Sequence, residues 1–393
     1  GTLDPASAPA KTWHDGGMIR TLLLVSLVCL AAALPSQRQR GAQRTPSTEA
    51  IMRRVPEGVE LRADIAYREG NPAWRLDLAL PKEKADAPRP GIVFVHGGGW
   101  RAGDKRRGYF IRGALDYASK GYVCISVNYR LSTDAPFPAC VEDVKCAVRW
   151  FRAHAQELQL DTKRIGGYGN SAGAHLVAML GLCGKDAKLE GDGPYQDQSS
   201  LIQAVCAAAT PTDFPNWPKG LRGFGRQGGL LGGSADTLED RAKAASPVTY
   251  AHKNAPPFLL IHGTADRVVP VSQPELLEKA LREVGARNVT LMKIEGAGHG
   301  VFMQKALVTH GAMRSFFDST IGPKRSVRRA RQGQRGWSFA RLLERQDQDG
   351  DNKISREEFR GPDRNFDRLD RDGDSMLTEA DFAPRQERRR RIR

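Results

Sequence analysis

The chain has 393 residues, of which 40% are hydrophobic and 27% charged, and a formal net charge of +15 at pH 7. This apolar content is too high for a disordered chain, and the length exceeds that of one ordinary small domain. Residues 55–321 hold 33 basic and 28 acidic side chains, so the excess charge lies elsewhere, in residues 36–54, 322–336 and 385–393. The composition therefore excludes a uniformly basic nucleic-acid-binding protein.

The longest apolar run, residues 22–34, is 13 residues long. A membrane-spanning helix needs about 20 apolar residues. The run follows a positive charge at Arg20 and ends near the small residues 31–33, as a signal peptide does. We therefore expect residues 1–35 to be a leader and signal peptide, the mature chain to have no transmembrane span, and the protein to be secreted or periplasmic. The alternative is an N-terminal anchor that is never cleaved.

From residue 59 onward, short β-rich runs alternate with helical stretches. Val59–Tyr67 and Trp74–Leu80 alternate apolar and polar residues, which favours half-exposed antiparallel strands. The later strand runs are continuously apolar or small, as in buried parallel strands. The pattern predicts an α/β domain over residues 55–321, with a mostly parallel twisted sheet flanked by helices. The later strands are expected at 91–95, 122–127, 164–168, 202–208, 258–261 and 289–294, and the helices at 109–120, 138–157, 172–183, 273–285 and 301–319.

A G-x-S-x-G pentapeptide at residues 169–173 follows one expected strand and opens one expected helix. The turn from strand to helix is so tight that side chains at positions 169 and 173 would clash, which explains why both are glycine. Such a turn holds its serine, here Ser171, in a strained conformation at the carboxyl edge of the sheet. Ser171 is therefore the candidate nucleophile.

The segment HGGGW at residues 96–100 follows another strand of the expected sheet. Glycines leave their backbone N–H groups uncovered, so these groups can converge on an oxygen that becomes negative during acyl transfer. We expect Gly98, Gly99 and the residue after the nucleophile, Ala172, to form this oxyanion hole. His96 precedes the glycines and is interpreted as a residue that positions the loop.

A serine nucleophile of this type is followed along the chain by an acid and then a histidine, each after a strand. Asp266 and His299 occupy such positions, after the strands expected at 258–261 and 289–294. Neutral His299 would take the proton of Ser171, and Asp266 would fix the histidine tautomer and stabilise the imidazolium. The less favoured alternatives are Asp213 and Glu295 as the acid, and His175 and His262 as the base.

Together these motifs resemble the α/β-hydrolase superfamily, and within it the exported bacterial esterases of the feruloyl and acetylxylan esterase type. The resemblance covers about residues 59–319 and includes the segments GTADRVVP at 263–270 and GAGHG at 296–300. It implies a secreted serine carboxylesterase that hydrolyses small acyl esters, such as acetyl or feruloyl groups on polysaccharide, with no cofactor in the catalysis. A triad does not separate ester from amide cleavage, so an amidase, arylformamidase or peptidase remains the alternative.

Two acidic segments follow a basic linker at 322–336 and precede a basic tail at 385–393. Each places oxygen-bearing side chains at alternate positions of a twelve-residue loop, which suits a cation that takes six to eight oxygen ligands. An apolar residue at position 8 of each loop would pair the two loops through a short β-bridge. The ligand candidates are Asp347, Asp349, Asp351, Lys353, Ser355 and Glu358 in the first loop, and Asp370, Asp372, Asp374, Met376, Thr378 and Asp381 in the second, with Lys353 and Met376 contributing their backbone.

Residues 337–384 thus resemble a pair of EF-hands, and the resemblance implies Ca²⁺ as the bound cation. Position 6 is Asn352 or Ser375 in place of the usual glycine, and position 12 of the second loop is Asp381, which is shorter than glutamate. This module also raises a third hypothesis, a calcium-dependent binding protein that docks a protein partner or cell surface and carries the hydrolase domain as a passenger. The basic flanks match no nucleic-acid-binding motif, so no specific nucleic-acid partner is expected.

Overall fold

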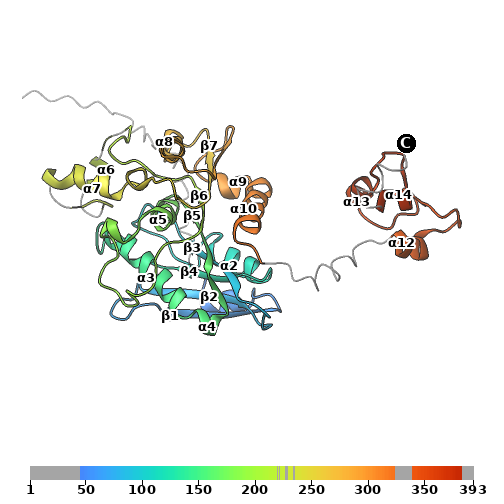
Figure 1. Ribbon diagram of the computed structural model, residues 1–393, viewed down its shortest axis with the longest axis horizontal. Coiled ribbons are helices and arrows are strands. Elements are labelled where there is room, and N and C mark those ends of the chain that lie inside the picture. The colour runs from blue at the N-terminus through green and yellow to red at the C-terminus, as the bar shows by residue number, and fades with distance from the viewer. Residues whose placement is uncertain are drawn as a thin grey trace, which may run out of the picture. The chain divides into compact units, whose positions relative to one another are not determined.

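The computed structural model describes residues 45–218, 220, 222–225, 229–232, 235–323 and 339–382. The expected signal peptide, the basic tail and most of the basic linker lie outside these residues. The first body is built on an eight-stranded sheet of order β1-β2-β4-β3-β5-β6-β7-β8 (Figure 1). Strands β3 to β8 run parallel, and β1 and β2 form an antiparallel edge. The strands are β1 Val59–Ala66, β2 Arg75–Pro81, β3 Arg89–Val95, β4 Val123–Val127, β5 Leu160–Asn170, β6 Ala204–Ala208, β7 Phe258–Gly263 and β8 Val289–Ile294.

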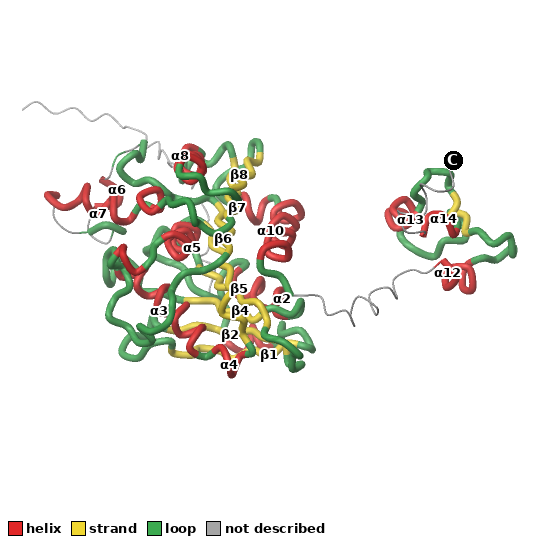
Figure 2. Tube along the Cα trace, viewed as in Figure 1, coloured by secondary structure: helices red, strands yellow, loops and turns green. Residues whose placement is uncertain are grey.

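Helices cover both faces of this sheet (Figure 2), because successive side chains of a buried strand point to opposite sides. In β3, Val93 and Val95 pack into one apolar core, with residues of α3, α5 and α8. Ile92 and Phe94 pack into the other, with residues of α2 and α10. This is the α/β-hydrolase fold that the sequence predicts. The helices are α1 Thr48–Met52, α2 Phe110–Ala118, α3 Ala139–Ala153, α4 Ala155–Leu158, α5 Ala172–Leu182, α6 Arg222–Gly225, α7 Leu238–Ala245, α8 Ser272–Glu283, α9 Val301–Gln304 and α10 Ala306–Thr320.

The structure corrects three details of the expected elements. The helices expected at 138–157 and 301–319 are each broken, at His154 and at Lys305, where the backbone leaves helical geometry. Strand β2 was expected to be half-exposed, but residues 76–80 are all buried. Its polar residue Asp77 is buried because it forms ion pairs with Lys105 and Arg106. None of the described helices has both the length and the apolar character needed to cross a bilayer.

Residues 339–382, called the C-terminal body here, form three helices and a two-stranded antiparallel ribbon. It has its own small apolar core, to which Leu342, Phe359 and Phe366 contribute together with Ile354 and Leu377. The last two residues stand opposite each other in the ribbon, so the expected pairing of the two acidic loops through position 8 is confirmed. The elements are α12 Phe339–Gln346, β9 Ile354–Ser355, α13 Asp363–Leu369, β10 Met376–Leu377 and α14 Glu379–Phe382.

Candidate functional site

Ser171 lies at the turn between β5 and α5, with φ of 57° and ψ of −121°. An L-residue rarely adopts this positive φ, so the turn is strained, as the sequence motif predicts. A Cβ atom on Gly169 would lie 2.1 Å from the carbonyl oxygen of Gly173, and one on Gly173 would lie 2.0 Å from the carbonyl oxygen of Val95. Both glycines are therefore required by the close approach of β3, β5 and α5.

Ser171, His299 and Asp266 form one hydrogen-bonded chain at the carboxyl edge of the sheet. The distance from His299 Nε2 to Ser171 Oγ is 3.0 Å, and the distance from His299 Nδ1 to Asp266 Oδ2 is 2.8 Å. The carboxylate accepts a hydrogen bond, so His299 carries its proton on Nδ1 and its Nε2 accepts the hydroxyl proton of Ser171. This is the tautomer that a general base for the serine requires.

The carboxylate of Asp266 is buried and held on both oxygens. Its Oδ1 accepts hydrogen bonds from the backbone N–H of Val268 at 2.8 Å and of Val269 at 3.0 Å. Burial raises the pKa of Asp266, but the hydrogen bonds from His299 and these two N–H groups outweigh it and leave the pKa below its usual value. Asp266 therefore remains ionised, as it must to hold an imidazolium.

The glycine-rich segment 96–100, called the oxyanion loop here because its N–H groups are expected to form the oxyanion hole, lies directly against the Ser171 turn. A Cβ on Gly97 would lie 2.5 Å from the carbonyl oxygen of Asn170 and 3.4 Å from Ser171 Cβ. Gly98 and Gly99 have φ of 124° and 61°, positive values that glycine adopts much more readily than other residues. Within the described part of the chain, no acceptor takes a hydrogen bond from the N–H of either residue. The N–H of Ala172 is the first of α5 and has no partner inside the helix. The three N–H groups that the sequence predicts for the oxyanion hole therefore have no acceptor among the described residues.

The other residues singled out from the sequence have different environments. The ring of His96 stacks on Tyr129 with ring centroids 4.4 Å apart, and its Nδ1 lies 2.8 Å from the carbonyl oxygen of Gly97. Asp213 accepts hydrogen bonds from the backbone and side chain of Asn216. Glu295 is exposed. Neither carboxylate is hydrogen-bonded to a histidine in the described residues.

His262, the other alternative base, lies beside Asp266. Its Nε2 donates to the carbonyl oxygen of Val269 at 3.0 Å and lies 3.5 Å from Asp266 Oδ2. The residue is buried, and burial lowers its pKa. His262 therefore supports the acid loop, and no hydrogen bond joins it to Ser171 in the described residues.

Sequence reasoning missed Gln273, which lies at the start of α8 and is fully buried. Its Oε1 accepts hydrogen bonds from the backbone N–H of Thr212 at 2.9 Å and of Asp213 at 2.8 Å. Its Nε2 donates to the carbonyl oxygen of Asp213 at 3.0 Å. Gln273 therefore connects the segment that follows β6 to the segment that follows Asp266. A glutamine near a helix start gives no sequence signal for this role.

A cluster of four charged side chains, of which only Asp64 is exposed, surrounds the start of the segment that follows the oxyanion loop. Lys105 Nζ is 2.9 Å from Asp77 Oδ1 and 2.6 Å from Asp64 Oδ1. Arg106 contacts the same two carboxylates, with Nε 2.6 Å from Asp77 Oδ2 and one guanidinium nitrogen 2.6 Å from Asp64 Oδ2. The backbone N–H of Lys105 also donates to the side-chain oxygen of Asn128. These contacts anchor the chain that leaves the oxyanion loop to β2 and to the end of β4.

Comparison with known proteins identifies the family of this domain. The BD-FAE family model matches residues 76–281, which is more than half of the chain. The chain belongs to the BD-FAE family. The matched region contains the Ser171 turn and Asp266, and the remainder of the hydrolase body supplies His299.

The BD-FAE domain is similar to several esterases. It is 33% identical over 234 residues to esterase LipC of Mycobacterium tuberculosis, covering 58% of this chain and 57% of LipC. A truncated carbohydrate esterase from gut microbiota has a TM-score of 0.55 and 28% identity, covering 66% of this chain and 95% of that one. Esterase 2 of Thermogutta terrifontis, phosphonylated by cyclosarin, has a TM-score of 0.52 and 28% identity, covering 68% and 97%. Residues 76–281 thus belong to a carboxylic ester hydrolase domain, in a chain that spans about 57% of LipC.

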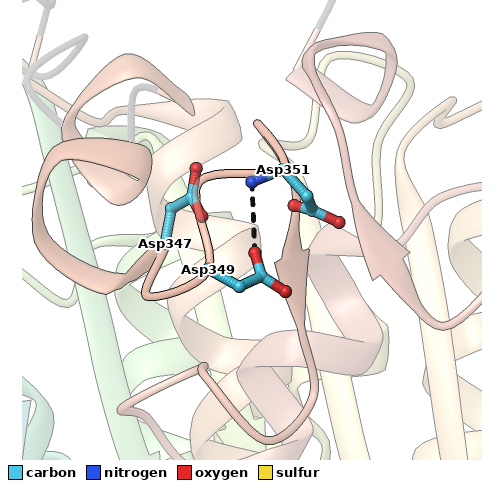
Figure 3. Close-up of side chains that lie close together, drawn as sticks. All are labelled: Asp347, Asp349 and Asp351. Atoms are coloured by element: carbon cyan, nitrogen blue, oxygen red, sulfur yellow. Dashed lines mark hydrogen bonds between the residues drawn. The ribbon is translucent and has the colours of Figure 1, made fainter.

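The acidic loops of the C-terminal body gather their carboxylates tightly. Carboxylate oxygens of Asp347, Asp349 and Asp351 lie within 4.8 Å of one another (Figure 3), and the same holds for Asp370, Asp372 and Asp374. Each loop is tightened by hydrogen bonds from backbone N–H groups to its own carboxylates, such as the 2.8 Å bond from the N–H of Gly350 to Asp347 Oδ1.

Positions 6 and 12 of the two loops are also alike. Asn352 and Ser375 have φ of 64° and 65°, the left-handed conformation for which position 6 usually has glycine.

At position 12, Glu358 accepts hydrogen bonds from the N–H of Gln348 and of Ser355, each at 2.8 Å. Asp381 accepts the equivalent bonds from Arg371 and Thr378, each at 2.9 Å. The backbone N–H bonds to Glu358 lower its pKa to about 2, so the carboxylate is ionised at neutral pH. The donor set is all oxygen, which fits a hard divalent cation.

Proposed function

We propose that the protein is a serine carboxylesterase that uses Ser171, His299 and Asp266 as its triad. The observation that carries the proposal is the continuous hydrogen-bonded chain from Ser171 Oγ through His299 to Asp266. The family membership of residues 76–281 supports it. The phosphonylation of the related esterase 2 by cyclosarin supports an activated nucleophile in the same fold.

The reaction would proceed in two acyl transfers. Ser171 Oγ attacks the ester carbonyl carbon while His299 Nε2 takes the hydroxyl proton, and the N–H groups of Gly98, Gly99 and Ala172 stabilise the oxyanion. The tetrahedral intermediate collapses, the alcohol leaves with the proton from His299, and an acyl-enzyme remains on Ser171. Water then attacks the acyl carbon with His299 as base, and the carboxylic acid is released.

For the substrate, we propose short acyl esters on polysaccharide, with acetyl or feruloyl groups as the first candidates. The similarity to a carbohydrate esterase from gut microbiota supports this class over simple lipids. We also propose that the protein is exported, on the basis of the apolar run at residues 22–34. Mass spectrometry of the mature N-terminus from the producing cell would test export, and an intact leader in the cytosol would contradict it.

A panel of substrates tests the activity. The purified protein is expected to hydrolyse p-nitrophenyl acetate, acetylated xylan and methyl ferulate with higher kcat/KM than the matching anilides, formamides or peptides. Ser171→Ala is expected to reduce ester turnover by about 10⁴-fold or more. If Ser171→Ala kept most of the activity, the triad assignment would be wrong. Faster amide cleavage would instead favour an amidase or peptidase.

We propose in addition that the acidic loops bind Ca²⁺ through the side chains and backbone carbonyls named above. The paired β-ribbon and the six clustered aspartates support this proposal. Bound Ca²⁺ would neutralise repulsion among these carboxylates and stabilise the module. Calorimetric titration with Ca²⁺ is expected to give heat of binding, and no heat at millimolar Ca²⁺ would contradict it.

The partner-binding hypothesis can be separated from the esterase hypothesis. A variant that lacks residues 337–393 is expected to retain esterase turnover. If it also lost Ca²⁺-dependent retention on cells or polysaccharide, the module would have a docking role in addition to its structural one.

A further inference from the structure

His175 lies one helical turn after Ser171 on α5 and has no part in the triad. Its side chain is fully buried. One ring nitrogen, Nε2, lies 2.7 Å from the carbonyl oxygen of Ala245, the last residue of α7. The other, Nδ1, lies 3.1 Å from Nε1 of Trp100, the residue that follows the oxyanion glycines. The imidazole therefore bridges three separate segments around the nucleophile.

The two partners fix the tautomer of His175. A backbone carbonyl only accepts, so Nε2 must carry the hydrogen that faces Ala245. An indole N–H only donates, so Nδ1 must present its lone pair to Trp100. Burial lowers the pKa of His175 to about 4, so the ring is neutral at neutral pH and this arrangement is the populated one.

Trp100 needs such support because its backbone is strained. Its φ is 58°, in the left-handed region that a bulky L-residue rarely adopts, and it follows two glycines with positive φ. The indole ring packs edge-on against His175 and against Phe214, with centroid distances of 5.4 Å and 5.7 Å. The carbonyl oxygen of Trp100 accepts a hydrogen bond from the N–H of Ser132 at 2.8 Å. The ring and the backbone of Trp100 are thus held by different parts of the fold.

We propose that His175 and Trp100 are positioning residues for the oxyanion hole, in which the imidazole of the nucleophile helix holds the indole and thereby the N–H groups of Gly98 and Gly99. This inference rests on the esterase function proposed above. The hydrogen bond ties the helix that carries Ser171 to the loop that carries the donors, so nucleophile and donors keep one relative position. An oxyanion hole acts on the transition state, so loss of this tie lowers kcat with little change in KM.

Trp100→Phe removes the indole N–H and keeps an aromatic ring, and the same truncation at a second tryptophan controls for the smaller side chain. We expect kcat to fall by about tenfold or more, a fraction of the 10²- to 10³-fold lost when one oxyanion donor is deleted. KM is expected to stay within about twofold. Trp217→Phe is the matched control, because Trp217 belongs to the same aromatic cluster, through Phe214 and Phe224, and has no hydrogen bond or ring contact with His175 among the described residues. An unchanged kcat in Trp100→Phe would overturn the proposal.

Two amide variants at His175 separate positioning from simple filling of the core. In His175→Asn the amide oxygen can occupy the place of Nδ1 and accept from Trp100, whereas in His175→Gln the amide reaches the place of Nε2 and Ala245. We expect the Asn variant to keep kcat within about threefold of the wild type and the Gln variant to lose about tenfold or more, as Trp100→Phe does. Equal losses in the two variants would show that only packing matters and would overturn the proposal.

A readout that does not depend on turnover distinguishes this proposal from the proposed function. The indole ¹H–¹⁵N NMR signal of Trp100, assigned by its loss in Trp100→Phe, is expected to be retained in His175→Asn and shifted in His175→Gln. A wild-type protein with no esterase activity but with this pattern would contradict the function and leave the pair intact. An indole signal unaffected by His175→Gln would contradict the pair. Affinity for a trifluoromethyl ketone, whose adduct places an oxyanion in the hole, should fall in parallel with kcat/KM.

Discussion

The Nε2 atom of His299 lies 3.0 Å from the Oγ of Ser171, although the two residues are 128 positions apart in the chain. Their proximity follows from the sheet, because β5 and β8 are parallel and their carboxyl ends lie at one edge. β6 and β7 separate the two strands, so the loop after β8 must cross this edge to bring its histidine to the serine. Asp266 follows β7, the strand next to β8, and accepts a hydrogen bond from Nδ1 of His299, the ring nitrogen that faces away from Ser171.

Asp266→Asn is expected to lower kcat by about 10⁴-fold at neutral pH. The asparagine keeps the size of the side chain, but its amide can donate to Nδ1 of His299 and so favour the tautomer that cannot take the proton of Ser171. Steady-state hydrolysis of p-nitrophenyl acetate measures the effect. Glu295→Gln is the matched control, since Glu295 is exposed, and it should remain close to wild type. The reverse ranking of the two variants would show that Glu295 is the acid.

Gln273→Leu is expected to destabilise the protein by about 3 kcal/mol or more, because it leaves two buried N–H groups and one carbonyl without a partner. These groups belong to Thr212 and Asp213, after β6. Urea denaturation monitored by circular dichroism measures the loss. Gln198→Leu is the control, since the side chain of that glutamine is partly exposed and its amide donates to the neighbouring Asp197. A cost below about 1 kcal/mol would mean that water replaces the amide.

The sequence predicts the elements that depend on local signals. Continuous apolar runs identify the parallel strands, and the glycines at 169 and 173 mark a turn whose crowding is confirmed by the contacts a Cβ would make. The order of the acid and the histidine after successive strands is also a local feature, because parallel strands must end at one edge.

Partners that depend on long-range packing could not be predicted. Asp77 occupies a polar position of an alternating strand, and nothing in the sequence indicates that Lys105 would make it a buried residue. The position of His175 one turn after Ser171 suggests only an alternative base, because its partners, Trp100 and Ala245, are brought to it by the tertiary fold. The role of Gln273 also depends on tertiary packing, since its three side-chain hydrogen bonds join segments about 60 residues apart.

Stability is expected to fall as the pH is lowered from about 6.5 to about 4. Burial lowers the pKa of both His96 and His175 to about 4, whereas a histidine in the unfolded chain has a pKa of about 6.5. In this window the unfolded chain binds more protons than the folded protein, so the free energy of unfolding decreases as protons are added. The full shift corresponds to about 3 kcal/mol for each histidine. The lowered pKa of Asp266 acts in the same direction, at pH values below about 4.

Urea denaturation at pH 7, 5.5 and 4.5 measures this slope. His175→Asn should be less sensitive to pH than the wild type, because one buried base is removed. His252→Asn serves as the control, since His252 is not among the fully buried histidines, and it should keep the wild-type slope. A pH slope that His175→Asn leaves unchanged would show that His175 does not contribute to acid denaturation.

The two acidic loops are expected to differ in calcium affinity because of position 12. Glu358 and Asp381 accept equivalent backbone bonds, but an aspartate has a shorter side chain and is less suited to bidentate ligation. Asp381→Glu should therefore tighten Ca²⁺ binding at the second loop. Glu358→Gln removes the charge of the ligand proposed at position 12 and should weaken binding at the first loop by at least about tenfold.

Isothermal titration of the full chain with Ca²⁺ resolves these effects. Glu357→Gln is the matched control for Glu358→Gln, because it removes the same charge from an exposed neighbour at position 11 of the same loop. If the two variants weakened binding equally, the loss would come from net charge alone and position 12 would not be a ligand. The ribbon between Ile354 and Leu377 joins the loops, so ordering one loop is expected to help order the other. Leu377→Ala should then weaken binding at both loops, whereas an effect at the second loop alone would contradict coupling through the ribbon.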